Sequence, residues 1–244
     1  MINRLKNFLH IIKKNSFKDW RVSFDYCPLC CKNVYFISFC RTALETRCIS
    51  CRNTCINLSM IPVIDSILPV EYAYEMSSYG GTLEFLRKKV NCIVTSEFYP
   101  NYDLGSYFNG VRIEDVQKLT FESNSFDLVT SNQVFDHVPD DIKGFKEVYR
   151  VLKHGGFFVF GVPLYDLGST KQVAVLTEKG IRFNGKPEYL GSRLEGPNSV
   201  PTFWRHSFND IEDRLKKVGF SAKIVEITVT TIQGSPYKIV KCQK

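Results

Sequence analysis

Paired cysteines carry the most distinctive chemistry in this sequence. Seven of the nine cysteines lie between residues 27 and 55, and four of them form two C-x-x-C motifs that are separated by 17 residues. This spacing is typical of a zinc ribbon, in which two tight turns bring four thiolates around one ion. A site with four sulfur ligands has no open position, so we expect a structural Zn²⁺ held by Cys27, Cys30, Cys48 and Cys51. Spacing alone leaves Cys31 or Cys55 open as a substitute ligand.

Acidic, amide and imidazole side chains form a second group with possible chemistry. They follow the ends of short apolar segments that we predict to be strands: residues 70–76, 91–96 and 126–131. The carboxyl ends of parallel strands meet at one edge of a sheet, where ligands bind in the crevice outside them. We therefore expect a binding crevice near Glu97, Asn132, Gln133, Asp136 and His137.

The elements that position this group are clearest between residues 126 and 163. A β-favouring segment is followed by Asp140, which is suited to cap a helix, and by apolar residues that recur every three or four positions. We place Lys153 and His154 in the last helical turn, with Gly155 as its terminator and residues 157–162 as a second, fully buried strand. The pattern predicts a βαβ unit in a covered parallel sheet.

Several motifs in this block resemble those of class I AdoMet-dependent methyltransferases of the methyltransferase-11 type. They are NSFDLVTSNQVFDHVPDD, EVYRVLKHGG and the following strand, which ends in VP. Phe135-Asp136 stands where the family usually has Leu-Glu, and His154 stands where it has Pro. The cysteine motifs ahead of this block resemble methyltransferases with an N-terminal zinc ribbon. The resemblance implies an α/β, Rossmann-like, doubly wound and mostly parallel seven-stranded sheet with an antiparallel last strand, preceded by a small zinc-ribbon module.

The resemblance also implies S-adenosyl-L-methionine as cofactor and gives roles to residues that would bind it. The turn from Glu75 to Gly81 would approach its methionine and ribose parts, although Ser77 and Tyr79 replace the usual glycines and only Gly80 and Gly81 remain. Glu97 would accept hydrogen bonds from the ribose hydroxyls. The adenine edge would face Asp115 and Val116, and the methionine part or the acceptor would face Asn132 and Gln133.

Asp136 and His137 are the candidate catalytic pair. They have the chemistry to remove a proton from an acceptor hydroxyl or amine. A hydrogen bond that organises the loop is the competing interpretation. Methyl transfer from a sulfonium needs little more than alignment and removal of a proton, so no larger catalytic group is required.

The segment 164–206 is rich in Gly, Pro, Ser and charge, and we expect an irregular lid over the acceptor side of the crevice. Its candidate contact residues are Tyr165, Tyr189, Arg193, Trp204, Arg205 and His206. After it, residues 207–210 resemble a capping box that opens a helix to Lys217, and residues 221–231 and 237–242 predict a closing hairpin.

The net charge of +7 comes entirely from residues 1–60, which hold 10 Lys or Arg against 3 Asp or Glu. We expect a basic amphipathic helix at 1–22, the zinc ribbon at 23–62, with short strands at 34–39 and 56–63, and the methyltransferase domain at 65–244. No apolar segment is long enough to cross a bilayer and no secretory signal is evident, so we expect a cytoplasmic protein without a transmembrane segment.

The methyltransferase-like block at 126–163, together with Glu97, Asp115 and the long lid, favours a methyltransferase that acts on a small-molecule or glycan-type acceptor. An RNA methyltransferase that grips phosphates through its basic N-terminal region is the first alternative. A catalytically inactive binding protein that has kept the fold is the second, and the degenerate glycine turn is the reason to consider it.

Overall fold

The computed structural model describes residues 19–40, 42–192 and 196–244. Residues 1–18 of the predicted N-terminal helix (1–22) and the lid candidate Arg193 lie outside the described residues. The end of that prediction is wrong, because Arg21 and Val22 lie in a strand. Within these ranges, no helix combines the length and apolar character needed to span a membrane.

A mostly parallel sheet forms the centre of the molecule. Its parallel strands are β4 (Tyr72–Glu75), β5 (Cys92–Glu97), β7 (Val111–Ile113), β8 (Phe126–Asn132) and β9 (Leu152–Gly161). The hairpin of β17 (Ser221–Ile227) and β18 (Tyr237–Gln243) completes one side, with β18 antiparallel to β9. The short β6 (Tyr107–Phe108) pairs antiparallel with β7 at the other edge. The order β17-β18-β9-β8-β4-β5-β7-β6 contains the predicted seven strands and adds β6.

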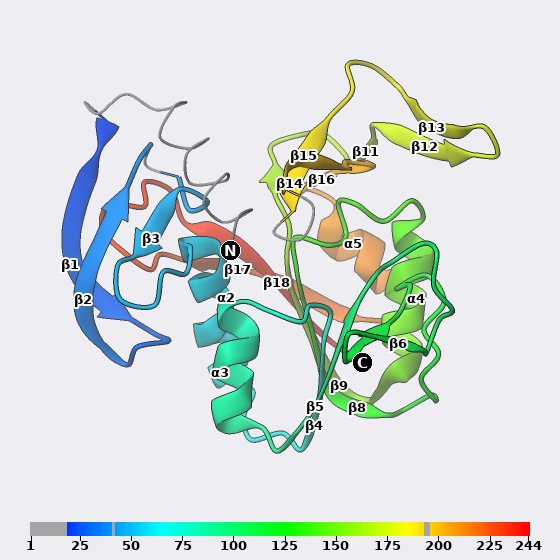
Figure 1. The fold of residues 1–244 in the computed structure, drawn as a ribbon, viewed down its shortest axis with the longest axis horizontal. Helices are drawn as coiled ribbons and strands as arrows, with labels where there is room; N and C mark the ends of the chain where they lie inside the picture. The colour runs from blue at the N-terminus through cyan, green and yellow to red at the C-terminus, as the bar shows by residue number, and fades with distance from the viewer. Residues whose placement is uncertain (1–18, 41, 193–195) are drawn as a thin grey trace.

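Helices cover both faces of this sheet (Figure 1). One face carries α2 (Cys55–Asp65) and α3 (Gly81–Lys89), and the other carries α4 (Asp141–Val151) and α5 (Ile211–Lys216). Alternate side chains of one strand enter different cores, because successive residues of a strand point to opposite faces. In β9, Phe158 and Phe160 pack beside α4, whereas Val159 packs beside α2. The doubly wound fold is thus confirmed.

The N-terminal ribbon is a three-stranded antiparallel sheet made of β1 (Arg21–Cys27), β2 (Lys32–Ser38) and β3 (Thr46–Cys48). Its inner residues share a core with α2 and the central sheet, so the ribbon packs directly on the larger fold. The Asp25 carboxylate adds a polar link, because it accepts hydrogen bonds from the hydroxyls of Thr230 and Thr231.

The prediction of a strand at residues 56–63 is wrong, because this segment lies in α2. Thr54 caps the helix by accepting a hydrogen bond from the Asn57 N–H at 3.3 Å. The helix is buried between the ribbon and the central sheet, so nearly all of its sides are apolar. A short run of this kind has no periodicity that distinguishes a helix from a buried strand.

Two predicted helix boundaries are also wrong. The helix α4 ends at Val151, so Lys153 and His154 lie in β9 instead of a last helical turn. The Lys153 ammonium lies 2.8 Å from the Asp127 carboxylate and fixes the start of that strand. Likewise, α5 begins after Asp210, and Ser207 belongs to a strand. The Asp140 cap of α4 is confirmed by its hydrogen bond from the Lys143 N–H.

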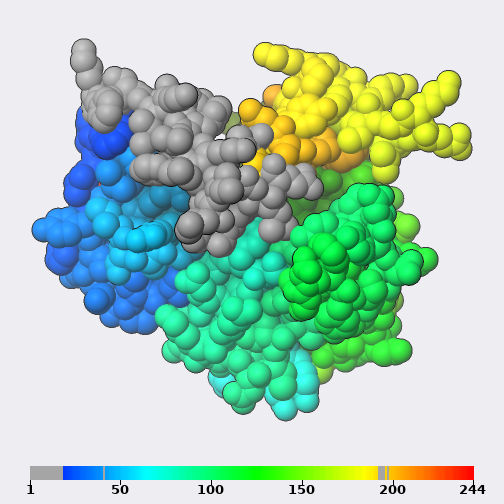
Figure 2. Space-filling model, in the orientation of Figure 1, coloured from blue at the N-terminus to red at the C-terminus, as the bar shows by residue number. Residues whose placement is uncertain are grey.

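The segment 164–206 is more regular than we expected. It contains a three-stranded sheet of β10 (Leu164–Tyr165), β11 (Lys171–Gln172) and β16 (Trp204–Ser207). Two hairpins lie between β11 and β16 in the chain. One is formed by β12 (Ala174–Thr177) and β13 (Gly180–Phe183), and the other by β14 (Tyr189–Ser192) and β15 (Gly196–Pro201). Figure 2 shows this segment, in yellow, gathered on one side of the molecule beyond the central sheet.

Candidate active site and metal centre

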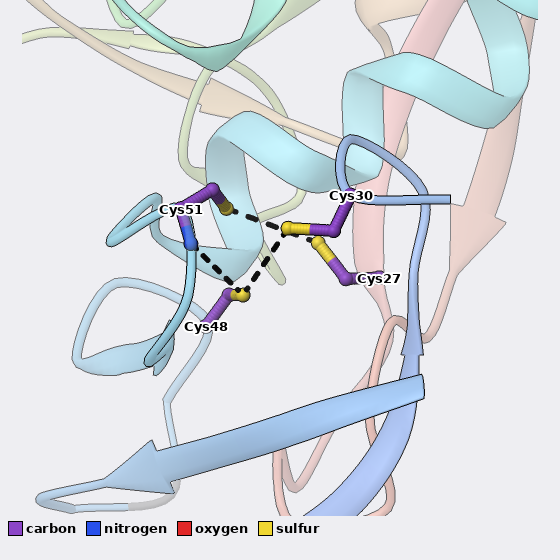
Figure 3. A group of neighbouring side chains, drawn as sticks. All are labelled: Cys27, Cys30, Cys48 and Cys51. Carbon is purple, nitrogen blue, oxygen red and sulfur yellow. Dashed lines mark hydrogen bonds between the residues drawn. The ribbon is translucent and has the colours of Figure 1, made fainter. Parts of the chain in front are cut away.

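The four predicted zinc ligands lie together. Their sulfur atoms are all within 4.8 Å of one another, and they come from the turn after β1 and the turn after β3 (Figure 3). The Cys27 and Cys51 sulfurs are 3.8 Å apart, and those of Cys30 and Cys48 are 3.9 Å apart. A tetrahedron with Zn–S bonds of about 2.3 Å has edges of about 3.8 Å. The arrangement fits a tetrathiolate ion site and is far too open for disulfides.

The surplus cysteines stay outside this group. Cys31 is exposed and its sulfur lies 3.5 Å from the Pro28 carbonyl, while Cys40 contacts the Thr42 hydroxyl. Cys55 is fully buried at the start of α2. The sulfur contact between Cys27 and Cys51 raises the pKa of Cys27 and lowers that of Cys51 to about 5, because the two atoms share one proton. A divalent cation would replace that proton.

Glu75 is the last residue of β4. It is only 1% exposed, and its carboxylate accepts a hydrogen bond from the Thr130 hydroxyl of the neighbouring strand. Burial raises its pKa to about 8, because the charged form loses its hydration. Its side chain therefore links the ends of β4 and β8.

The turn after β4 is tied to Glu97 at the end of β5. The Glu97 Oε1 accepts hydrogen bonds from the Ser78 N–H and the Ser78 hydroxyl, both at 2.7 Å, and Oε2 takes part in neither. Burial raises the pKa of Glu97, and hydrogen bonds from Ser78 and from the Ser77 side chain oppose that effect. Gly80 has φ +113° at the start of α3, a conformation that side chains disfavour. A Cβ on Gly81 would lie 2.9 Å from the Asn53 side chain, so bare backbone is required there.

Asp115 and Val116 lie on the next stretch of this edge. The Asp115 carboxylate accepts from the Gln117 N–H at 2.8 Å, which makes it a turn cap as well as a candidate for the adenine edge. Val116 is 8% exposed and packs in the core near Gly144 and Phe135. Most of its surface is thus already in contact with protein.

Asn132 and Gln133 end β8 and point in different directions. The Asn132 amide donates to Asn57 Oδ1 of α2 at 2.8 Å, and its own Oδ1 is buried without a hydrogen-bond partner. Gln133 has φ +58°, which turns the chain sharply, and its amide donates to the Tyr237 hydroxyl at 2.6 Å. One residue therefore faces α2, and the other faces the closing hairpin.

Asp136 and His137 do form a neighbouring pair. The His137 Nε2 lies 3.6 Å from Asp136 Oδ2, and His137 Nδ1 lies 2.7 Å from the Pro201 carbonyl oxygen. The Asp136 backbone carbonyl accepts from the N–H groups of Phe203 and Trp204. The pair therefore lies where the loop after β8 meets the end of the inserted segment.

The inserted segment uses several of its candidate residues for its own structure. His206 is fully buried, and Trp204 donates its indole N–H to the Val138 carbonyl at 2.9 Å. Arg205 pairs with Glu188. Tyr165 stays 41% exposed and Tyr189 43%. Burial and the nearby Asp136 charge raise the pKa of Tyr165.

The sequence analysis did not identify three residues that form hydrogen bonds with the predicted site residues. Ser78 holds Glu97, Asn57 holds Asn132, and Tyr237 holds Gln133. Asn57 had a signal in the sequence, since it is an amide within an otherwise apolar run. Tyr237 had none, because it lies 104 positions from its partner.

Residues 87–160 match a family model described as a methyltransferase domain. A 49-residue stretch is 49% identical to the arsenite methyltransferase of Mus musculus and covers 20% of this chain and 13% of that protein. A 132-residue stretch is 28% identical to the arsenite methyltransferase of Aquipseudomonas alcaligenes and covers 53% of this chain and 36% of that protein. The chain thus spans roughly a third or less of the curated relatives it matches.

Solved structures show the same fold. The 1,6-didemethyltoxoflavin-N1-methyltransferase of Burkholderia thailandensis has a TM-score of 0.50 at 12% identity, over 77% of this chain and 79% of that chain. A putative S-adenosylmethionine-dependent methyltransferase from Listeria monocytogenes has a TM-score of 0.50 at 13% identity, over 77% and 97%. Residues 87–160 therefore match a methyltransferase domain, and the chain shares the Rossmann-like fold of these solved methyltransferases.

Proposed function

We propose that this protein transfers the methyl group of AdoMet to a small-molecule or glycan-type acceptor. The observation that carries the proposal is the position of Glu97. Its carboxylate lies at the end of β5, beside the turn after β4, and one of its oxygens is not used by Ser78. A carboxylate in this place suits the hydroxyls of a ribose.

Orphaned polar atoms near the same edge support a polar ligand. Asn132 Oδ1, Thr82 Oγ1 and Ser131 Oγ are buried and have no hydrogen-bond partner among the described residues. Thr82 lies in the first turn of α3, and the other two lie at the end of β8. Buried polar groups normally have partners, so these atoms fit a bound molecule rich in donors and acceptors. The crevice therefore suits AdoMet despite Ser77 and Tyr79.

In this proposal each residue has a limited task. Glu97 binds the ribose, Asp115 accepts from the adenine amine beside Val116, and Asn132 and Gln133 face the methionine part or the acceptor. Glu75, Ser77 and Gly80 set the shape of the turn. AdoMet supplies an activated methyl group, so the chain mainly has to exclude water, align the acceptor and receive a proton.

A small acceptor is supported by the relatives and by the inserted segment. The curated relatives are named arsenite and sterol methyltransferases, which indicates low-molecular-weight acceptors in those proteins. In this chain, residues 164–206 meet the Asp136 loop and form the acceptor side. We propose the same division of the chain as above: an N-terminal helix, a zinc ribbon at 23–62 with a structural ion, and the methyltransferase domain. A cytoplasmic location stays a prediction.

The RNA alternative ranks second because of where the charge lies. Residues 1–18 hold 5 Lys or Arg and no acid, whereas residues 19–60 hold 5 Lys or Arg against 3 acids. A zinc ion with four thiolates adds about −2, which cancels the remaining +2 of the ribbon. The ribbon itself therefore has no electrostatic excess for phosphates.

Calorimetric titration of the zinc-replete chain with S-adenosylhomocysteine tests the proposal. We expect binding at micromolar strength and release of S-adenosylhomocysteine when AdoMet and an acceptor are supplied. A chain that takes up neither AdoMet nor S-adenosylhomocysteine would refute the proposal and favour the inactive binding protein.

A further inference from the structure

The Asp136 carboxylate is buried in an unusual way. Its side chain is 3% exposed, and neither oxygen has a hydrogen-bond partner among the described residues. A buried carboxylate without a donor is costly, because it gives up its hydration and gains nothing in return. The loop geometry is nevertheless fixed, since the Asp136 carbonyl holds the N–H groups of Phe203 and Trp204.

The imidazole of His137 does not supply the missing donor in its neutral form. Its Nδ1 lies 2.7 Å from the Pro201 carbonyl oxygen, which can only accept a hydrogen bond. Nδ1 must therefore carry the proton, and Nε2 presents a lone pair. That lone pair lies 3.6 Å from Asp136 Oδ2. In this neutral form, two acceptors stand side by side with no proton between them.

Nearby cations already have other partners. Arg205 pairs with Glu188, and Arg214 binds the Asp141 carboxylate through two nitrogens at 2.7 and 2.9 Å. His206 is buried, and its pKa is lowered by burial. The remaining neighbours are aromatic: burial and the Asp136 charge raise the pKa values of the Tyr165 and Tyr237 hydroxyls. The Asp136 carboxylate therefore has two tyrosine hydroxyls within electrostatic reach and no unpaired cation among the groups named here.

We propose that the methyl acceptor presents a primary amino group to Asp136 and His137. The inference rests on the proposed methyltransferase function and names its substrate class. An amino group has at least two N–H donors, one for Asp136 Oδ2 and one for His137 Nε2. A hydroxyl has a single proton and satisfies only one of the two acceptors. A carboxylate or phosphate acceptor would meet like charge.

The reaction balances with these two residues. An amine that arrives as ammonium passes one proton to His137 Nε2, and its lone pair becomes free. That lone pair forms the N–C bond to the methyl group of AdoMet, and the C–S bond breaks with its electron pair on sulfur. The product nitrogen regains a positive charge next to Asp136, which stabilises it. Asp136 thereby favours the transition state as well as binding.

Matched acceptors test this proposal on the full-length, zinc-replete chain. The probes are benzyl, phenethyl and cyclohexylmethyl compounds, each as the amine, the alcohol and the carboxylate. Ligand-observed NMR measures their binding to protein saturated with S-adenosylhomocysteine, and product release measures turnover with AdoMet. We expect each amine to bind at least about tenfold more tightly than its alcohol, because a site built for donors rejects analogues that lack them.

Two variants make the test specific. Asp136→Asn keeps the shape of the side chain and should weaken amine binding about tenfold to a hundredfold, so that amine and alcohol become similar. Asp166→Asn removes the same charge from an exposed aspartate next to Tyr165 and should retain the amine preference. A circular dichroism melt confirms that each variant is folded.

Several outcomes would overturn the inference. They are equal binding of amines and alcohols, a preference for carboxylates, no amine binding to the loaded protein, or an amine preference that survives Asp136→Asn. Failure of the proposed function looks different, because S-adenosylhomocysteine would then not bind in the first place. The cofactor titration is therefore run before the acceptor series.

Discussion

Replacing Glu97 by Ala removes the one carboxylate that we assign to the cofactor ribose. In the structure, Oε1 already accepts two hydrogen bonds of 2.7 Å from Ser78. The mutation therefore has two effects: it deletes the ribose contact and it releases the turn after β4. Because Glu97 is a charged acceptor, each hydrogen bond to a ribose hydroxyl contributes about 1.5–3 kcal/mol.

Two such bonds, reduced by the cost of breaking the contacts with Ser78, give a loss of about 2–4 kcal/mol of binding free energy. Since each 1.4 kcal/mol changes the affinity tenfold, S-adenosylhomocysteine should bind roughly 30-fold to 1000-fold more weakly. Calorimetric titration of wild type and Glu97→Ala at the same pH and salt measures the ratio. A thermal melt of both proteins without ligand measures how much the turn has loosened.

Two further variants separate the two effects. Ser78→Ala removes the hydroxyl bond to Glu97 but leaves the carboxylate, so affinity should stay within about threefold of wild type. Glu97→Gln keeps an acceptor for the Ser78 N–H and loses the charge, so its affinity should fall between wild type and Glu97→Ala. The ribose contact of Glu97 would be refuted if Glu97→Ala bound S-adenosylhomocysteine as tightly as wild type. It would also be refuted if Ser78→Ala lost as much affinity for S-adenosylhomocysteine as Glu97→Ala.

Three other predictions follow from single contacts. Cys48→Ser should lose the zinc ion, measured by metal analysis, and should melt at a lower temperature than wild type. Cys31→Ser, outside the sulfur group, should retain the zinc ion and the wild-type melting temperature. Gly80→Ala should lower the free energy of unfolding, measured by denaturant titration, by about 1–3 kcal/mol, because Gly80 has φ +113°. Gly168 has open space around it, so Gly168→Ala should lower that free energy by less than about 0.5 kcal/mol. Burial raises the pKa of Glu75 to about 8 from an ordinary 4.5, so the folded state holds more protons and stability falls as pH rises through that window. Glu75→Gln removes this effect, and its melting temperature relative to wild type should rise between pH 6 and 8.5; a constant difference would contradict the role of Glu75.

Local patterns predicted the elements around the crevice well. The strand, capped helix and second strand from Phe126 to Gly161 are confirmed, as are the predicted strands at β4 and β5 and the closing hairpin. The two C-x-x-C motifs did bring four sulfurs together. Each of these features depends on residues that are close in the sequence, where side-chain period, caps and short motif spacing act directly.

The errors came where burial decides the local structure. The apolar run at 56–63 became a helix because it packs between the ribbon and the sheet. The inserted segment became a set of short strands, since its backbone groups pair with one another instead of with water. Val116 lies in the core, as is usual for an apolar β-branched side chain, so little of it is left to contact an adenine ring.

The central βαβ order, the clustering of the four cysteines and the class of fold could be read from the sequence, because periodicity and motif spacing are local properties. The pairing of distant side chains depends on the tertiary fold. Asn57 reaches Asn132 across 75 positions, Gln133 reaches Tyr237 across 104, and Asp25 reaches Thr230 across 205. The fold also leaves the Asp136 carboxylate without a hydrogen-bond donor, 3.6 Å from His137 Nε2. Such contacts depend on how the sheet and its connections pack, and no local pattern specifies them.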